Sequence, residues 1–105
     1  MADVDGGSII NLGSTVVFIV AGNMAAYVTA KAGIQGMTRA LARGFGKDQI
    51  RVNCIQPDWI LTERSRGLWF DESSAKTILE NQCLPTTLHL EAVASMALLL
   101  AVDDS

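Results

Sequence analysis

Tyr27 is the only tyrosine of the chain, and Lys31 follows it at the i+4 position. On a helix this spacing places both side chains on one face, about one turn apart. An ammonium beside a phenol favours the phenolate, so a tyrosine in that setting can act as a general acid or base near neutral pH. Ser14 lies upstream, just after an apolar run, where its hydroxyl could hold a carbonyl or carbinol oxygen while Tyr27 moves the proton.

The same spacing also has a purely structural interpretation. A packed or surface tyrosine beside a solvated lysine is the commoner outcome for one such pair. The choice between the two interpretations therefore depends on the secondary-structure elements predicted around Tyr27 and Lys31.

Those elements form a strand, a helix and a second strand. Residues 8–12 are a short apolar run bounded by glycine, and residues 50–55 are a second apolar run before a proline. Between them a helix is predicted from Asn23 or Met24, with Asn23 as its cap, to the segment 44–46. Strand, helix and strand in this order predict a βαβ unit with parallel strands.

The second half of the chain predicts a loop and two helices. Trp59, Trp69 and Phe70 lie close together after the second strand, where they could form a lid, an interface or a structural cluster. Residues 73–82 predict a short helix, and residues 90–102 predict a helix that is apolar on nearly all sides and therefore buried. His89 precedes it, in a capping or surface role.

Composition limits the classes of function. The chain has 105 residues, 50% of them hydrophobic and 18% charged, with a net charge of −3. One small globular domain fits these values, whereas a basic patch for nucleic acid or a polybasic membrane anchor does not. No apolar stretch is long enough to span a bilayer, and the acidic start differs from a signal peptide.

The two cysteines and the single histidine also limit the chemistry. Cys54 and Cys83 match neither a zinc-binding spacing nor a disulfide framework, so both are expected to be reduced thiols. His89 has no second histidine or acidic cluster with which to hold a metal. We therefore expect a soluble, cytoplasmic protein without a metal site.

Three segments in this order resemble the short-chain dehydrogenases/reductases: residues 7–14 (GSIINLGS), Tyr27-x-x-x-Lys31, and residues 50–57 (IRVNCIQP). The likeness runs through nearly the whole chain. It implies an α/β fold, a Rossmann-like doubly wound parallel sheet that is partial: a βαβ unit plus C-terminal helices, without the N-terminal half. Residues 1–105 would then be the C-terminal catalytic part of a single Rossmann domain, and residues 15–22 a loop although they could pass for a strand.

The resemblance also implies roles for individual residues. Tyr27 would be the general acid/base, Lys31 would favour its phenolate and bind the nicotinamide ribose, and Ser14 would position the substrate. A hydride would pass between NAD or NADP and an alcohol or carbonyl substrate. At the cofactor, Tyr27 and Lys31 would be joined by three positions of the following loop: Pro57, Ile60 and Thr62.

Segments around the expected substrate loop are most similar to the aldose 1-dehydrogenases of pentose or galactose type, namely residues 59–63, 68–69, 82–83 and 103–105. A sugar C1 hydroxyl is therefore the expected substrate group. In its full-length form we expect a homo-oligomer, a dimer or a tetramer, with neither nucleic acid nor membrane as a partner.

Two departures from the family pattern count against a working enzyme. Asp58 follows Pro57 where the family has glycine, and the family's glycine-rich first turn, Asn-Asn-Ala-Gly segment and catalytic asparagine would all lie upstream. The chain is thus expected to be a central and C-terminal segment of a longer enzyme. The alternative is a non-catalytic fragment that acts as an assembly or dimerisation module, because the Tyr-x-x-x-Lys helix also builds a subunit interface in this family.

The same patterns predict the packing. A two-stranded unit should leave its edges and one face uncovered. Gly33 and Gly36 are expected where another backbone approaches the helix closely. The predicted core consists of residues on strands or apolar helical stripes: Ile9, Ile10, Leu41, Phe45, Val52, Cys54, Met96, Leu99 and Leu100.

Overall fold

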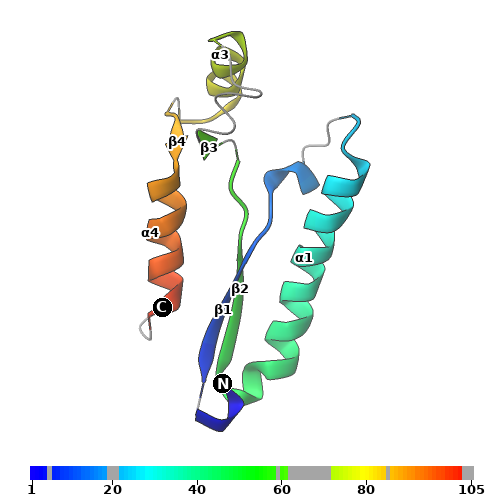
Figure 1. Ribbon diagram of the computed structural model, residues 1–105, viewed down its shortest axis with the longest axis vertical. Helices are drawn as coiled ribbons and strands as arrows, with labels where there is room; N and C mark the ends of the chain where they lie inside the picture. Colours follow the sequence, from blue (N-terminus) through cyan, green and yellow to red (C-terminus); the bar gives the residue numbers. More distant parts are fainter. Residues whose placement is uncertain (5, 19–21, 59, 62–71, 85, 103–105) are drawn as a thin grey trace.

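The computed structural model describes residues 1–4, 6–18, 22–58, 60–61, 72–84 and 86–102 (Figure 1). Short 3-10 turns lie at η1 (Ala2–Val4), η2 (Thr15–Val17) and η3 (Gly46–Asp48). The helices and strands are, in chain order, β1 (Gly7–Leu12), α1 (Ala25–Phe45), β2 (Ile50–Ile55), β3 (Ile60–Leu61), α3 (Glu72–Asn81), β4 (Leu88–His89) and α4 (Leu90–Ala101).

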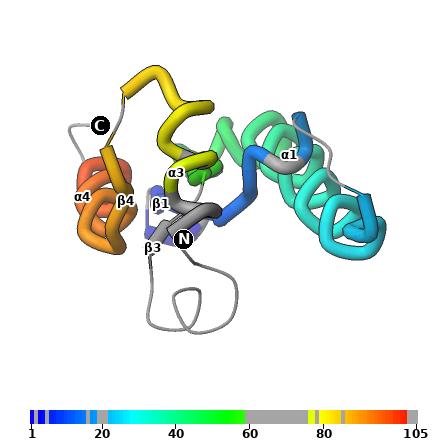
Figure 2. The backbone as a smooth tube through the Cα atoms, turned by 90° about the horizontal axis from the view of Figure 1, so that it is seen from above, coloured from blue at the N-terminus to red at the C-terminus, as the bar shows by residue number. Residues whose placement is uncertain are grey.

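β1 and β2 form the predicted parallel pair, in register from Gly7 opposite Ile50 to Leu12 opposite Ile55. α1 packs against one side of this pair and α4 against the other, and the end-on view in Figure 2 shows the two helices on opposite sides. The arrangement is a three-layer α/β/α unit, which confirms the α/β, Rossmann-like prediction. The expectation that one face of the sheet would be uncovered was wrong, because α4 lies on it.

α1 begins differently from the prediction. Its N-cap position is Met24, and no side chain makes a capping hydrogen bond there. Asn23 has a left-handed backbone, with φ of 62°, which asparagine tolerates better than most residues. Asn23 therefore turns the chain into the helix instead of capping it.

The turn from α1 into β2 uses a left-handed residue that is not glycine. The helix ends at Phe45 and passes into η3, with Gly46 in a right-handed helical conformation. Gln49, with φ of 61°, is the left-handed residue that stops η3 directly before β2. The predicted boundary near residues 44–46 is confirmed for the α-helix, while the turn into β2 is made three residues later.

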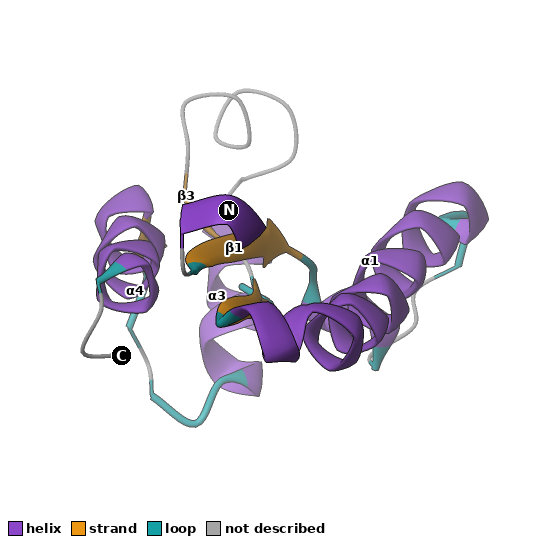
Figure 3. Cartoon of the chain, turned by 90° about the horizontal axis from the view of Figure 1, so that it is seen from below, coloured by secondary structure: helices purple, strands orange, loops and turns teal. Residues whose placement is uncertain are grey.

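A second, short parallel pair joins β3 to β4, with Ile60 opposite Leu88 and Leu61 opposite His89. The sequence did not predict these strands, which have two residues each. α3 and α4 follow the predicted helices to within one residue. Figure 3 shows β3 and α3 between α1 and α4 when the chain is seen from below.

The core is smaller than predicted. Ile50 and Val52 are its buried hydrophobic residues among those that the structure describes, while Ile9, Ile10, Leu41, Cys54 and Leu100 are half-buried. The prediction was wrong for Phe45, Met96 and Leu99, which are 41%, 45% and 55% exposed. A sheet of two strands is too narrow to cover all sides of an apolar helix such as α4.

Two further findings concern the helices. Among the described residues, no atom outside the local helix lies within 4 Å of the position that a Cβ would take at Gly33 or Gly36, so the expected close backbone approach is not seen there. Within the described ranges, no helix combines the length and the apolar character needed to cross a membrane.

Candidate active site

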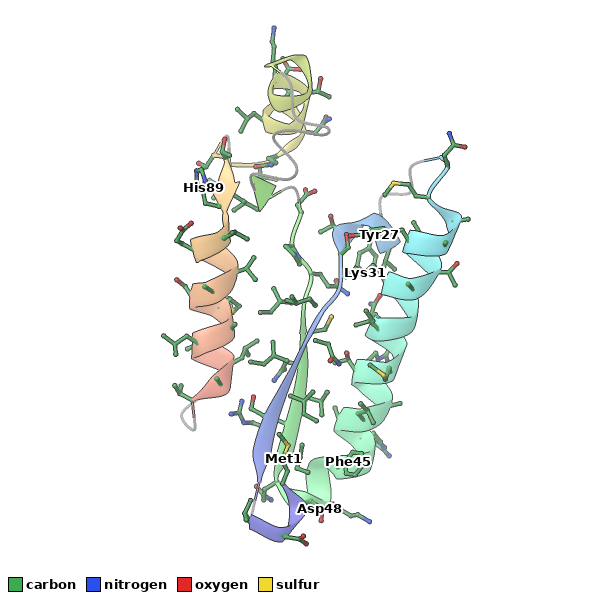
Figure 4. The ribbon with its side chains drawn as sticks, in the orientation of Figure 1. Met1, Tyr27, Lys31, Phe45, Asp48 and His89 are labelled. Carbon is green, nitrogen blue, oxygen red and sulfur yellow. The ribbon has the colours of Figure 1, made fainter. Side chains whose placement is uncertain are left out.

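Tyr27 and Lys31 lie together on the first turns of α1. Lys31 Nζ is 5.7 Å from the centroid of the Tyr27 ring, which is within the range of a cation–π contact. Tyr27 is 45% exposed, so its ring is accessible from solvent as well as from Lys31. In Figure 4 both side chains occupy the space between α1 and η2.

Lys31 also connects α1 to the sheet. Its Nζ donates a hydrogen bond of 3.1 Å to the carbonyl of Leu12, the last residue of β1. The ammonium is thus held between the ring of Tyr27 and the carboxyl end of a parallel strand. In open α/β sheets, ligands bind outside that end of the strands.

Ser14 lies at the same end of the sheet and is 5% exposed. The neighbouring backbone is bonded to β2 and to the residues that follow it, since Gly13 N donates to the Ile55 carbonyl over 2.8 Å and Thr15 N donates to the Pro57 carbonyl over 3.4 Å. η2, which α1 contacts, begins at the residue after Ser14. The backbone on either side of Ser14 therefore ties the end of β1 to the end of β2 and the residues after it.

Gly13 lies close to two side chains at the end of β2. A Cβ at this position would lie 2.9 Å from Cys54 Sγ and 3.1 Å from Gln56 Cγ. Both distances are shorter than ordinary contacts, so the side chains of Cys54 and Gln56 would have to move to admit a side chain at position 13.

The three predicted loop positions are only partly described. Pro57 is half-buried and its carbonyl accepts the bond from Thr15, which places it beside Ser14. Ile60 opens β3 and pairs with Leu88. Thr62 lies outside the described residues. Asp58, the departure from glycine, is exposed.

Two polar residues that the sequence analysis did not single out link β1 to α1. Asn11 Nδ2 donates to Thr38 Oγ1 over 3.0 Å, and Thr38 Oγ1 donates to the Ile34 carbonyl over 2.7 Å. Thr38 is 6% exposed. A usable signal was present in the sequence, because Asn11 interrupts an apolar strand and Thr38 follows Lys31 by two helical turns.

Taken together, a phenol, an ammonium and a hydroxyl lie at the carboxyl end of a parallel strand pair. A phenol beside a cation can give or take a proton, and a nearby hydroxyl can hold the oxygen of the reacting group. The arrangement suits proton transfer at an oxygen atom.

The likeness to known proteins extends over the whole chain. The family model described as enoyl-(acyl carrier protein) reductase, of the short-chain alcohol dehydrogenase type, matches residues 1–105. A protein named "Probable galactose dehydrogenase" from Rhizobium meliloti is 45% identical over 100 residues, which are 95% of this chain and 39% of that protein. D-xylose 1-dehydrogenase from Caulobacter vibrioides is 43% identical over 100 residues, 95% of this chain and 40% of that enzyme.

Solved structures show the same partial overlap. A short-chain type dehydrogenase/reductase from Mycobacterium ulcerans matches with a TM-score of 0.87 at 27% identity, over 99% of this chain and 38% of that one. A structure assigned as an NAD(P)-dependent gluconate 5-dehydrogenase from Beutenbergia cavernae, with bound NADP at low occupancy, has a TM-score of 0.89 at 28% identity, over 98% and 41% of the two chains. The chain thus spans about two fifths of the length of the relatives it matches.

Proposed function

Because the chain belongs to the short-chain dehydrogenase/reductase family, we propose that residues 1–105 form the C-terminal catalytic part of one Rossmann domain and that the whole protein is an NAD(P)-dependent oxidoreductase. The observation that carries this proposal is the position of Lys31 Nζ, 5.7 Å from the Tyr27 ring and 3.1 Å from the Leu12 carbonyl. The Lys31 ammonium thus lies beside the Tyr27 ring and at the end of a parallel sheet where ligands bind.

In this proposal each residue acts on one oxygen atom of the substrate. During oxidation Tyr27 takes the proton from the substrate hydroxyl, while the hydroxyl of Ser14 holds the same oxygen in place. Lys31 holds its ammonium beside the Tyr27 ring during that transfer, with Nζ 5.7 Å from the ring centroid. During reduction Tyr27 returns the proton to the oxygen as the carbonyl becomes an alcohol.

The residues present suit a nicotinamide cofactor, NAD or NADP, at this end of the sheet. The Lys31 ammonium lies beside the Tyr27 ring and bonds to the carbonyl of Leu12 at the end of β1, and just beyond that strand Thr15 N donates to the Pro57 carbonyl. Tyr27, Lys31, Pro57, Ile60 and Thr62 would hold the nicotinamide and its ribose. When bound, this group accepts or supplies the hydride at the carbon that bears the reacting oxygen.

We propose an aldose as the substrate, oxidised at its C1 hydroxyl. The support comes from the relatives, a galactose dehydrogenase and a xylose 1-dehydrogenase at 45% and 43% identity. The two free thiols, Cys54 and Cys83, favour a reducing compartment such as the cytoplasm.

A second candidate function is an assembly module. α4 leaves Leu98 67% exposed and Leu99 55% exposed, next to the exposed Val102. Large exposed apolar side chains on one helix favour burial against another chain. This observation supports a homo-oligomer, a dimer or a tetramer, in the whole protein, whether or not the chain is catalytic.

Replacement of Tyr27 by phenylalanine tests the catalytic proposal. In the full-length protein, Tyr27→Phe should lower turnover of an aldose by at least about 100-fold, because the proton relay is lost. Affinity for NAD or NADP should be largely unchanged, since the ring remains. The measurement is steady-state kinetics with galactose and xylose, alongside cofactor titration; near-normal turnover in the variant would remove Tyr27 from the mechanism.

A further inference from the structure

The link from Asn11 through Thr38 to Ile34 is made inside the interface between α1 and the sheet. Thr38 is the one buried side chain of α1, and its neighbours Ile34 and Leu41 on the same stripe are half-buried and apolar. In such surroundings a hydrogen bond is stronger than in water, and an unpaired partner is costly. The two bonds are therefore a strong local restraint on the packing of α1.

The hydroxyl of Thr38 has one proton to donate, and this limits the kind of partner that β1 can offer. Its proton is used on the carbonyl of Ile34, one turn earlier, so its oxygen can only accept from β1. Asn11 supplies an amide N–H at that point, over 3.0 Å. The partner on the strand must be a donor, and asparagine meets this requirement.

Two adjacent residues of β1 are thus hydrogen-bonded to α1 at two different heights along the helix. Leu12 accepts from Lys31, and Asn11 donates to Thr38, two helical turns or about 10 Å further along the helix. Apolar contacts are non-directional and tolerate a small slide of the helix. Hydrogen bonds weaken steeply with distance and angle, so they define the position of α1 along β1.

We propose that Asn11 and Thr38 are positioning residues, which set the axial register of α1 against β1 and so hold Tyr27 and Lys31 at the level of Ser14. The catalytic consequence rests on the proposed function, whereas the register itself does not. Neither residue touches the reacting atoms in this scheme. Both act through Tyr27 and Lys31.

Thr38→Val tests the proposal, because it replaces the hydroxyl by a methyl group in a side chain of the same shape. Asn11 Nδ2 then faces no acceptor, and α1 should shift along β1. Thr38→Ser keeps the hydroxyl and should restore the parent behaviour. Thr29→Val is the matched control, since it makes the same change on an exposed position of the same helix.

Tyr27 offers a direct structural readout because it is the only tyrosine of the chain. In the full-length protein with labelled tyrosine, NMR should show the Tyr27 ring resonances, identified by their loss in Tyr27→Phe, and their contacts with η2. Thr38→Val should shift these resonances and weaken the contacts, while Thr38→Ser and Thr29→Val should leave both unchanged. Unchanged ring resonances and contacts in Thr38→Val would overturn the proposal.

The kinetic readout separates positioning from stability. In the full-length protein, kcat of Thr38→Val should fall about 10- to 100-fold, as expected for a small misplacement of a catalytic group, with little change in KM for the aldose. Thr38→Ser should recover kcat. A Thr38→Val protein that is folded and has the kcat of the parent contradicts the proposal.

Two further outcomes are informative. If Thr38→Val does not fold, Asn11→Ala replaces it, because it removes the donor while Thr38 stays bonded to Ile34; an undisturbed Tyr27 ring in that variant also overturns the proposal. If the parent protein has no oxidoreductase activity, the proposed function fails, and the NMR comparison still decides the register.

Discussion

At the scale of the residue, Lys31 has two partners from two different elements. The Tyr27 ring belongs to the same helix, and the Leu12 carbonyl belongs to the strand beside it. A lysine side chain has several rotatable bonds, and both contacts are needed to keep its ammonium in one place. The position of this charge therefore depends on the packing of α1 against β1 as much as on the i+4 spacing.

Gly13 offers a residue-scale prediction. Gly13→Ala should lower the free energy of unfolding by about 1–3 kcal/mol, because the new methyl group meets Cys54 Sγ and Gln56 Cγ. Gly36→Ala is the control: nothing lies within 4 Å of the added methyl group, and alanine should stabilise α1 by up to about 1 kcal/mol. Urea unfolding of both variants checks the pair, and an unchanged stability of Gly13→Ala would show that the Cys54 and Gln56 side chains can move aside without cost.

At the scale of the element, α4 is attached to the sheet by polar bonds at its carboxyl end. Arg51 Nη1 donates to the Leu100 carbonyl over 2.9 Å and Nη2 donates to the Val102 carbonyl over 3.0 Å, while Ser8 Oγ donates to Leu100 over 2.8 Å. The last carbonyls of a helix have no partner within the helix. A positive charge beside them is also attracted to the negative end of the helix dipole. Both strands thus hold the end of α4.

Arg51→Met should therefore loosen α4 more than the rest of the fold. We expect a loss of about 1–3 kcal/mol of stability and faster amide hydrogen exchange in α4 than in α1, because two carbonyls lose a charged donor. Arg39→Met is the matched control on an exposed position of α1. Exchange rates in α4 that match those of the parent would show that apolar packing alone holds this helix.

At the scale of the whole molecule, the described chain is a thin layer of two strands between two helices (Figure 1). Both faces of the sheet carry a helix, whereas the outer edges of β1 and β2 have no partner strand among the described residues. Leu98, Leu99 and Met96 are exposed on α4 as well. Open strand edges and exposed apolar side chains both favour association with further polypeptide.

The isolated 105-residue chain should accordingly neither bind a dinucleotide tightly nor behave as a stable monomer. Its one Gly-x-Gly, at residues 44–46, precedes a strand, whereas the pyrophosphate site follows one at a helix N-terminus. Calorimetry with NAD and NADP and light scattering check this. Micromolar affinity for either cofactor in a clean monomer would show that the segment is self-sufficient.

The sequence by itself determined the order and type of the main elements. The apolar runs at residues 8–12 and 50–55 and the helical stripe between them predicted β1, β2 and α1, because backbone period and side-chain pattern are local properties. The i+4 spacing likewise placed Tyr27 and Lys31 on one face of a helix. The predicted residues of the candidate site needed nothing beyond local patterns and the family resemblance to be named.

Only the tertiary structure decided which groups meet between elements. The bonds from Lys31 to Leu12, from Asn11 to Thr38 and from Arg51 to the end of α4 each join residues far apart in the chain, and no local pattern specifies them. The exposure of Phe45, Met96 and Leu99 was missed for the same reason, since hydrophobicity states what a side chain prefers while burial depends on how much surface the neighbouring elements provide.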